Sequence, residues 1–292
     1  MKIPGALLLL LLFSSAASAT PLDGLSLVYE TNFDDGTLNP SIDTLGIGPL
    51  LIGDTLIPGS NPTGMVEDGG LTLDITRPSG AVGPVGVAGV ALASFGQDSI
   101  VALRAVYALP VGPHDPSQTW AAGLVVRTYF LSDLPDSQRA AATFQIIGNA
   151  ARLNTPGAST PAGLPNIPQN VYDAIFSPTD PATFTLELVV DRITGTGYAS
   201  LSSDGYEISR SNYAFSIFGP DFGPDITALG PSLALNGGTD ISASLRVLDF
   251  QIFTQAIPEA PAWIVFAAGL FLVGAGKFRA ARPRDCALVD VC

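Results

Sequence analysis

The chain contains few of the residues from which catalytic and metal sites are commonly built. Its 292 residues include one histidine and two cysteines. The histidine, His114, stands in Val111-Gly112-Pro113-His114-Asp115-Pro116, where glycine and proline predict a loop. A catalytic zinc takes more than one nitrogen or sulfur ligand, so the sequence excludes a histidine-based zinc site. No Gly-x-Ser-x-Gly elbow accompanies His114, and nothing indicates a Ser-His-Asp hydrolase.

Positive charge is also scarce in the central part of the chain, residues 20–256. This part has eight arginines and no lysine, whereas it holds 23 of the 26 acidic residues of the chain. Such an acidic surface repels nucleic acid and anionic lipid, so we expect no nucleic-acid partner. An excess of acidic residues most commonly forms a solvated surface; the alternative is that it attracts divalent cations.

Cysteine is absent from the same central part. Cys286 and Cys292 both lie near the end of the chain, with a spacing that resembles no zinc signature. The central part therefore folds without a disulfide, although an exported protein would be allowed one.

The first 19 residues have the pattern of a secretory signal peptide. Lys2 supplies the positive start, the run from Leu7 to Phe13 supplies the apolar centre, and Ala17-Ser18-Ala19 supplies small residues for cleavage before Thr20. The apolar centre is too short to span a membrane. We therefore expect export of the mature chain.

Near the other end, no charged residue occurs from Ala260 to Gly276. With the flexible stems of the basic residues that follow, this run is long enough for one transmembrane helix, which needs about 17 to 25 residues. By the positive-inside rule the basic stop remains cytoplasmic, with a short tail at 285–292 behind it. A buried core helix is the alternative, but it should show a polar stripe. The basic stop consists of Lys277, Arg279, Arg282 and Arg284.

The residues before this run resemble the PEP-CTERM sorting signal of Gram-negative bacteria. Pro258 and Glu259 match its Pro-Glu pair, Ala260 replaces the usual second proline, and Trp263 matches the variant Pro-Glu-x-x-x-Trp. The resemblance covers residues 257–284 and implies an exosortase as processing partner. It also implies a transient inner-membrane anchor, followed by sorting to the cell surface, outer membrane or extracellular matrix. A generic C-terminal membrane anchor is the alternative.

Residues 20–256 have a length that suits one all-β domain. Glycine and proline punctuate short β-branched and aromatic runs, which predicts an antiparallel β-sandwich. Alternation is clearest from Phe184 to Asp191, and Asp204-Gly205 between two runs is a strong hairpin signal. Further strands are expected at 27–30, 70–76, 89–93, 100–109, 123–130, 143–147, 198–201, 206–208 and 243–253.

Two segments rich in glycine, proline and asparagine are expected to be loops. Residues 40–63 should hold at most one edge strand, and residues 154–170 should form a long surface loop. The best candidate for a helical turn is Asp133 to Arg139.

This layout resembles the concanavalin A-like, or laminin-G-like, jelly roll. The residues that carry the resemblance are the opening Tyr29 to Leu38, the set of strands and turns from Thr183 to Ile208, and a last strand that ends in Asp249-Phe250. The resemblance implies a carbohydrate-contacting or structural module. An immunoglobulin-like sandwich is the alternative.

Glycosidases of this fold carry Glu-x-Asp-x-Glu or Glu-x-Asp-x-x-Glu on one strand, which places two carboxylates about 5 Å apart. Glutamate occurs in the central part at positions 30, 67, 187 and 207, and none has an acid two residues away. Glu187 and Asp191 share a strand face, but a solvent-facing position explains Glu187 equally well. We therefore predict a non-catalytic protein; the alternative is a glycan-active enzyme whose site has no recognisable motif.

Calcium is the ion that best suits the acidic turns, because carboxylates and loop carbonyls bind it. Asp34 and Asp35, or Asp221 and Asp225, are candidate ligands, and turn capping is the alternative role. No other cofactor is expected. The candidates for aromatic side chains that stack on sugars are Trp120, Tyr129, Tyr198, Tyr206 and Tyr213.

Overall fold

The computed structural model describes residues 22–54, 62–79, 85–96, 99–112, 120–127, 140–147, 150–154, 167–214, 225–235 and 240–255. The chain divides into two compact units, Met1–Gln255 and Ala256–Cys292. All the described residues belong to the first unit, so the fold below is the fold of that unit. The signal peptide at 1–19 and the sorting tail at 257–284 lie outside the described residues.

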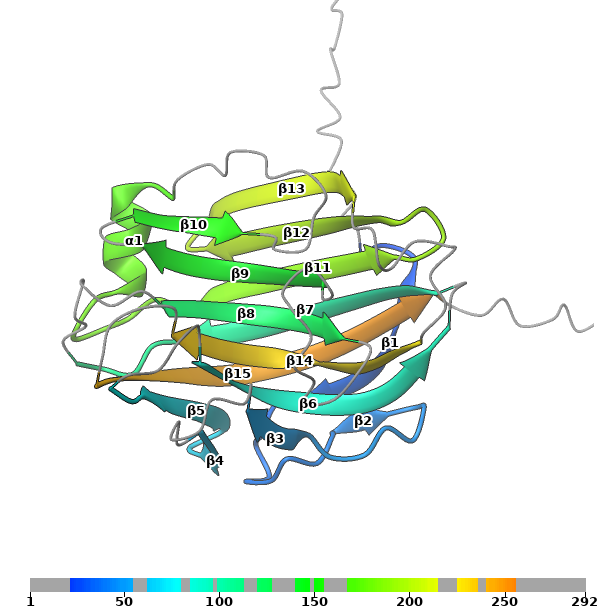
Figure 1. Cartoon of the computed structure of the whole chain (residues 1–292), viewed down its shortest axis with the longest axis horizontal. Helices are drawn as coiled ribbons and strands as arrows, with labels where there is room; N and C mark the ends of the chain where they lie inside the picture. The colour runs from blue at the N-terminus through cyan, green and yellow to red at the C-terminus, as the bar shows by residue number, and fades with distance from the viewer. Residues whose placement is uncertain are drawn as a thin grey trace, which may run out of the picture. The chain divides into compact units, whose positions relative to one another are not determined.

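The described part is built almost wholly of strands, with one short helix (Figure 1). The strands are β1 (Leu25–Thr31), β2 (Ile42–Asp43), β3 (Leu51–Asp54), β4 (Thr63–Glu67), β5 (Gly70–Arg77), β6 (Val85–Phe95), β7 (Ile100–Ala108), β8 (Trp120–Arg127), β9 (Ala140–Ile147), β10 (Ala150–Asn154), β11 (Phe184–Asp191), β12 (Thr196–Ser203), β13 (Tyr206–Ala214), β14 (Ile226–Leu235) and β15 (Ile241–Gln255); the helix is α1 (Gln169–Ile175).

The strands form two antiparallel sheets that lie face to face. The larger sheet has nine strands in the order β13-β12-β11-β7-β15-β1-β2, with β5 beside the first half of β15 and β4 beside β5. The smaller sheet has six strands in the order β10-β9-β8-β14-β6-β3 and lies in front in Figure 1. This confirms the predicted all-β antiparallel sandwich.

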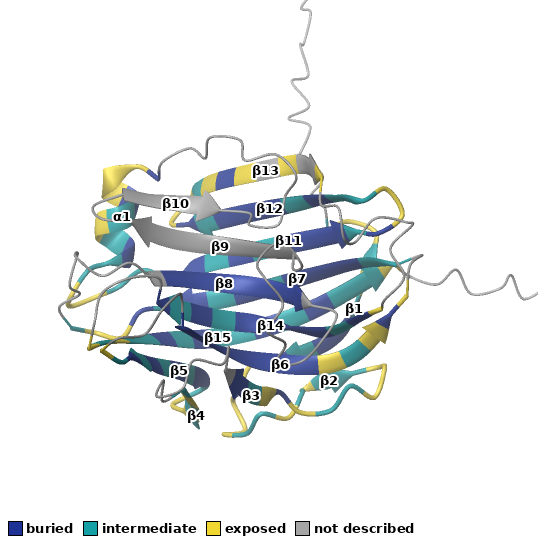
Figure 2. Cartoon of the chain, in the orientation of Figure 1, coloured by how far each residue is buried: buried dark blue, intermediate teal, exposed yellow. Residues whose placement is uncertain are grey.

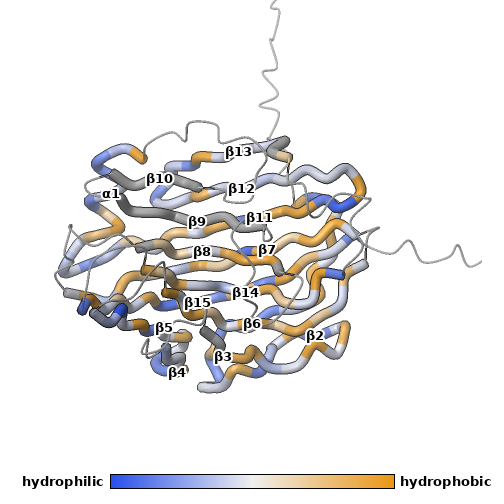
Figure 3. Tube along the Cα trace, in the orientation of Figure 1, coloured by the Kyte–Doolittle hydropathy of each residue, from blue (hydrophilic) through white to orange (hydrophobic). Residues whose placement is uncertain are grey.

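Alternating side chains explain why both sheets bury one face. In β11, Leu186 and Leu188 are fully buried, whereas Thr185 and Glu187, which alternate with them, are only half-buried. Successive strand residues point to opposite faces, so one face of the larger sheet faces the core and the other is turned away. Figures 2 and 3 show the same pattern as buried and apolar segments along the central strands. The core lies between the sheets.

In the larger sheet, the last strand, β15, joins distant parts of the chain. β15 pairs with β7 along one side, and with β5 and then β1 along the other. The register shifts between Val247 and Asp249, where β15 leaves β5 and approaches β1. Such a bulge bends the strand and re-aims the side chains that follow.

Several segments differ from the sequence-based expectation. Residues 40–63 were expected to hold at most one edge strand, but the structure has β2, β3 and the first residue of β4 there. Residues 154–170 were expected to be a loop, but α1 begins at Gln169. β4, β10 and β14 were not predicted. The predicted helical turn at 133–139 lies outside the described residues.

Candidate functional site

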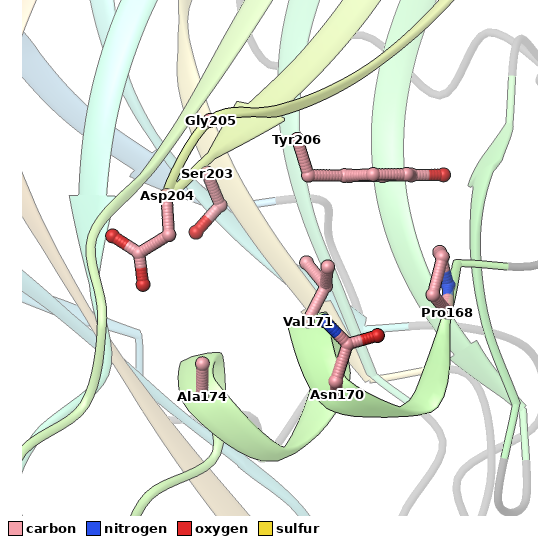
Figure 4. A pocket seen from close by; sticks show the side chains of 8 residues that line it. All are labelled: Pro168, Asn170, Val171, Ala174, Ser203, Asp204, Gly205 and Tyr206. Carbon is pink, nitrogen blue, oxygen red and sulfur yellow. The ribbon is translucent and has the colours of Figure 1, made fainter.

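An open pocket lies between α1 and the turn that joins β12 to β13 (Figure 4). Its volume is about 340 Å³, near the lower end of the range for small-molecule sites. The lining residues are Pro168, Asn170, Val171, Ala174, Ser203, Asp204, Gly205 and Tyr206. One wall therefore comes from a helix and the other from a hairpin.

The hairpin wall is fixed by the conformation of its two turn residues. Asp204 has φ of 47° and Gly205 has φ of 77°, and Ser203 pairs directly with Tyr206. Two central residues with positive φ match the twist of the flanking strands and favour a tight two-residue hairpin. This turn was predicted from Asp-Gly, and it brings the carboxylate and the aromatic ring to one end of the hairpin.

The helical wall is fixed by packing of the helix against the core. Val171 and Ile175 are buried in the core at a spacing of one helical turn, and Tyr172 stacks on Phe176 with ring centroids 4.5 Å apart. The backbone N–H of Ala182 donates to the carbonyl oxygen of Ala174 at 2.9 Å, which holds the end of the helix. Asn170 and Ala174 are likewise four residues apart, so they line the pocket from the same helix face.

The pocket combines an aromatic ring with polar groups of both hydrogen-bonding types. In Figure 4 the ring of Tyr206 extends above Val171, with Asp204 and Ser203 beside it. Burial raises the pKa of the Tyr206 hydroxyl, so it stays protonated and can donate. The Ser203 hydroxyl is occupied, because it donates to the carbonyl oxygen of Thr183 at 2.8 Å. Asn170 and Asp204 make no side-chain hydrogen bond to other described residues and present an amide and a carboxylate.

A second cavity of about 280 Å³ lies along the same turn. It shares Ser203, Asp204, Gly205 and Tyr206 with the first pocket, and its remaining lining residues are Thr183, Thr185, Ser202 and Glu207. Threonine and serine hydroxyls dominate this cavity, and Asp204 and Glu207 add two carboxylates.

A row of polar side chains crosses the outward face of the larger sheet. Glu187 pairs with Arg104, Arg104 with Gln251, and Gln251 with Glu30, on four adjacent strands. Nε of Arg104 lies 3.8 Å from Oε1 of Glu187, and Nε2 of Gln251 donates to Oε1 of Glu30 at 2.6 Å. Each carboxylate at the ends of this row thus has a partner within it.

Asp249 lies beside this row, immediately after the bulge in β15. Burial and the negative charge of Glu30 raise the pKa of Asp249 to about 6, and the Arg104 guanidinium opposes the shift. Its Oδ1 atom is buried and has no hydrogen-bond partner in the described part of the chain. Asp249 is therefore an acid whose charged form is poorly stabilised.

The candidate calcium residues are engaged in turns. Asp34 accepts a hydrogen bond of 2.7 Å from Nδ2 of Asn32, and Asp35 accepts one of 2.9 Å from the backbone N–H of Thr37. Asp225 accepts a hydrogen bond from Ser94, and Asp221 lies outside the described residues. Among the described residues, no group of three or more His, Cys, Asp or Glu side chains is arranged to hold a metal ion.

The residues predicted to direct export and sorting are not described by the structure. These are Ala17, Ala19, Pro258, Glu259, Trp263, Lys277, Arg279, Arg282 and Arg284. His114 is outside the described ranges as well. In the part of the chain that the structure describes, no helix has the length and apolar character needed to cross a membrane.

Of the five aromatic candidates, the structure brings Tyr206 to the pocket. Tyr198 lies on the outward face of the larger sheet, where burial raises the pKa of its hydroxyl. The side chains of Trp120 and Tyr213, and all of Tyr129, lie outside the described part. Asn170 was not predicted, although Val171 and Ile175 at i and i+4 are the signal that would have revealed its helix.

No protein-family model matches the chain, and no curated protein matches it. Among solved structures, lectin I from Ulex europaeus is similar at 12% identity and a TM-score of 0.43, covering 70% of this chain and 98% of its own. The Bauhinia forficata lectin is similar at 10% identity, with the same coverage and a TM-score of 0.45. An endo-1,3-beta-glucanase from Streptomyces sioyaensis reaches 13% identity and 0.48, covering 80% of this chain and 98% of its own.

Proposed function

We propose that this chain is a non-catalytic, exported surface protein whose sandwich contacts carbohydrate in the pocket between α1 and the β12–β13 turn. The observation that carries the proposal is the set of groups in that pocket. Tyr206 offers an aromatic face, Asn170 offers an amide, and Asp204 offers a carboxylate.

These groups suit a sugar for a definite physical reason. A sugar ring has an apolar face of C–H groups, which packs on an aromatic ring, and a rim of hydroxyls that both donate and accept hydrogen bonds. An amide supplies a donor and an acceptor, and a carboxylate supplies acceptors alone. The volume of about 340 Å³ admits one ring of this kind.

The outer sheet face argues against catalysis by the acids named from the sequence. Glu187 accepts a hydrogen bond of 3.2 Å from Ser200 and faces Arg104, so it is a paired charge. Asp191 accepts hydrogen bonds from the backbone N–H groups of Ile193 and Thr194, so it caps a turn. Neither carboxylate is arranged to act with the other across a sugar bond.

Location is the second half of the proposal. The signal-peptide pattern of residues 1–19 and the Pro258-Glu259 tail support export, membrane anchoring through residues 260–276 and processing by an exosortase. The acidic domain would then be displayed at the cell surface or in the extracellular matrix, where polysaccharide is the abundant partner.

Binding of the full-length protein to polysaccharide tests the carbohydrate contact. The protein is held in a detergent that carries no sugar, and polysaccharides immobilised on a sensor serve as probes. We expect Tyr206→Ala and Asn170→Ala each to weaken binding, the former by roughly tenfold. Asp173→Ala is the control for Asn170→Ala, because Asp173 lies on the same helix but not in the pocket. Binding that survives both pocket substitutions would overturn the proposal.

Glycan hydrolysis is the second candidate, and one observation favours it. Asp249, with its pKa raised to about 6 beside the Glu30 carboxylate, has the protonation behaviour of a general acid. Incubation of the full-length protein with polysaccharide tests this. New reducing ends that vanish in Asp249→Asn would establish hydrolysis, and unchanged chain length would exclude it for the glycans tried.

A further inference from the structure

The two cavities at the β12–β13 turn are parts of one surface. They share four lining residues, Ser203, Asp204, Gly205 and Tyr206. From this shared strip the first cavity extends to α1, and the second extends to Thr183 and Thr185 at the start of β11. A ligand longer than one sugar ring can therefore contact both cavities by crossing the turn.

The charges that line this surface are of one sign. Asp204 lines both cavities and Glu207 lines the second, and neither cavity has an arginine, lysine or histidine in its lining. Both acids are exposed and make no side-chain hydrogen bond to other described residues. The wider domain, which contains no lysine, adds to the same negative potential.

The aromatic ring of Tyr206 favours the same kind of ligand. Tyr206 lines both cavities, and its ring is half-buried against the core. The face of such a ring attracts an ammonium group. A surface lined by carboxylates and an aromatic ring is thus suited to a cationic amine and unsuited to an anionic ligand.

We infer that these two cavities form one binding site for a linear glycan whose sugars carry free amino groups. This inference rests on the proposed function and names the class of glycan. One sugar lies between Tyr206 and α1, and the next lies over Thr183, Thr185 and Ser202. Asp204 and Glu207 interact with the ammonium groups of successive sugars. An anionic glycan built of uronic acids is repelled by the same two residues.

Four probes separate this inference from carbohydrate binding in general. They are glucosamine, a β-1,4-linked glucosamine tetramer, the N-acetylated form of that tetramer, and a tetramer of a uronic acid. The full-length protein should bind the amino tetramer most tightly, roughly fivefold or more over the N-acetylated form at low salt. Its advantage should shrink as salt is added, because exposed charges are screened. The uronic acid tetramer should bind least.

Substitution at the second cavity tests whether both cavities take part. Glu207→Gln should weaken the amino tetramer by roughly threefold to tenfold and reduce its advantage over glucosamine. Asp180→Asn is the matched control, because Asp180 is an exposed carboxylate that lines neither cavity. It removes the same charge and should leave all four affinities unchanged.

The outcomes distinguish the inference from the function on which it rests. Equal binding of amino and N-acetylated tetramers, with both lost in Tyr206→Ala, would overturn the amine preference and leave the carbohydrate contact standing. Equal affinity for glucosamine and its tetramer would overturn the two-cavity site. Failure of all four probes to bind, while a neutral polysaccharide binds, would also overturn the inference alone.

Discussion

The hydroxyl of Tyr107, on the larger sheet, donates a hydrogen bond of 2.7 Å to the carbonyl oxygen of Gly123 on the smaller sheet. The same hydroxyl accepts a hydrogen bond from the backbone N–H of Ser232, so Tyr107 links β8 to β14. The residue before Ser232 is Pro231, which has no N–H to give to a neighbouring strand. A side chain from the opposite sheet thus satisfies backbone groups next to the proline in β14.

Tyr107→Phe tests this link. The ring remains, but the Gly123 carbonyl oxygen loses a buried donor, so we expect the free energy of unfolding to fall by about 1–3 kcal/mol. Chemical denaturation of the two proteins measures the difference. Tyr172→Phe is the control, because its hydroxyl makes no hydrogen bond within the described residues. An equal loss in the control would show that the link between the sheets is not the cause.

Gly230→Ala tests the close approach of β14 to β6. A Cβ at this position would lie 1.8 Å from the carbonyl oxygen of Gly89, which is backbone and cannot move aside cheaply. We expect a loss of about 3 kcal/mol in the free energy of unfolding. Gly96→Ala should be nearly neutral, because its nearest neighbour would be Oδ1 of Asp225 at 3.9 Å. Similar stability of the two variants would contradict the strand pairing.

Asp249 makes stability depend on pH. Its pKa is raised to about 6 in the folded state, whereas an aspartate in an unfolded chain titrates at about 3.9. Between these values the folded state binds more protons, so the free energy of unfolding falls as the pH rises from about 4 to about 6. Asp249→Asn should remove this fall. It should stabilise the protein by about 1–2 kcal/mol above pH 7, with solvent screening allowed for, and should have little effect near pH 4.

Denaturation curves across this pH range check the prediction, with Asp180→Asn as control. Asp180 is an exposed carboxylate, and its substitution should leave the slope unchanged. A wild-type slope that persists in Asp249→Asn would assign the titration to another group.

The sorting proposal predicts a processed C-terminus. Mass spectrometry of the mature protein from its native host should find a C-terminus upstream of Cys292. The Pro258→Ala, Glu259→Ala double variant should keep the full tail, because the recognition pair is gone. A full-length tail in both proteins would contradict processing and leave a generic membrane anchor as the interpretation of the tail.

Much of the sandwich could be predicted because its strands alternate. The run from Phe184 to Asp191 buries every second side chain, with Val189 buried as well, and the Asp204-Gly205 turn has the two positive φ values that its sequence favours. β14 escaped prediction for the opposite reason. Gly230 and Pro231 lie within it, and both of its faces are largely buried, so neither propensity nor alternation marks it. Its position depends on contacts with β6 and β8, which are distant in sequence.

The candidate site could be predicted only in part. Tyr206 was named as an aromatic candidate and Asp204 as a turn residue, because each has a local signal. The helix that forms the opposite wall has only seven residues and follows a segment rich in proline and asparagine. Asn170 lines the pocket opposite the turn because Val171 and Ile175 anchor that helix in the core. Such packing between distant segments has no local signature.

The carbohydrate contact is tested most directly by a crystal structure of the full-length protein bound to the amino-sugar tetramer. The account predicts a sugar ring between Tyr206 and α1, within hydrogen-bond distance of Asn170 and Asp204, and a second ring over Thr185 and Ser202. A sugar bound at another face of the sandwich, with the space beside Tyr206 empty, would contradict it.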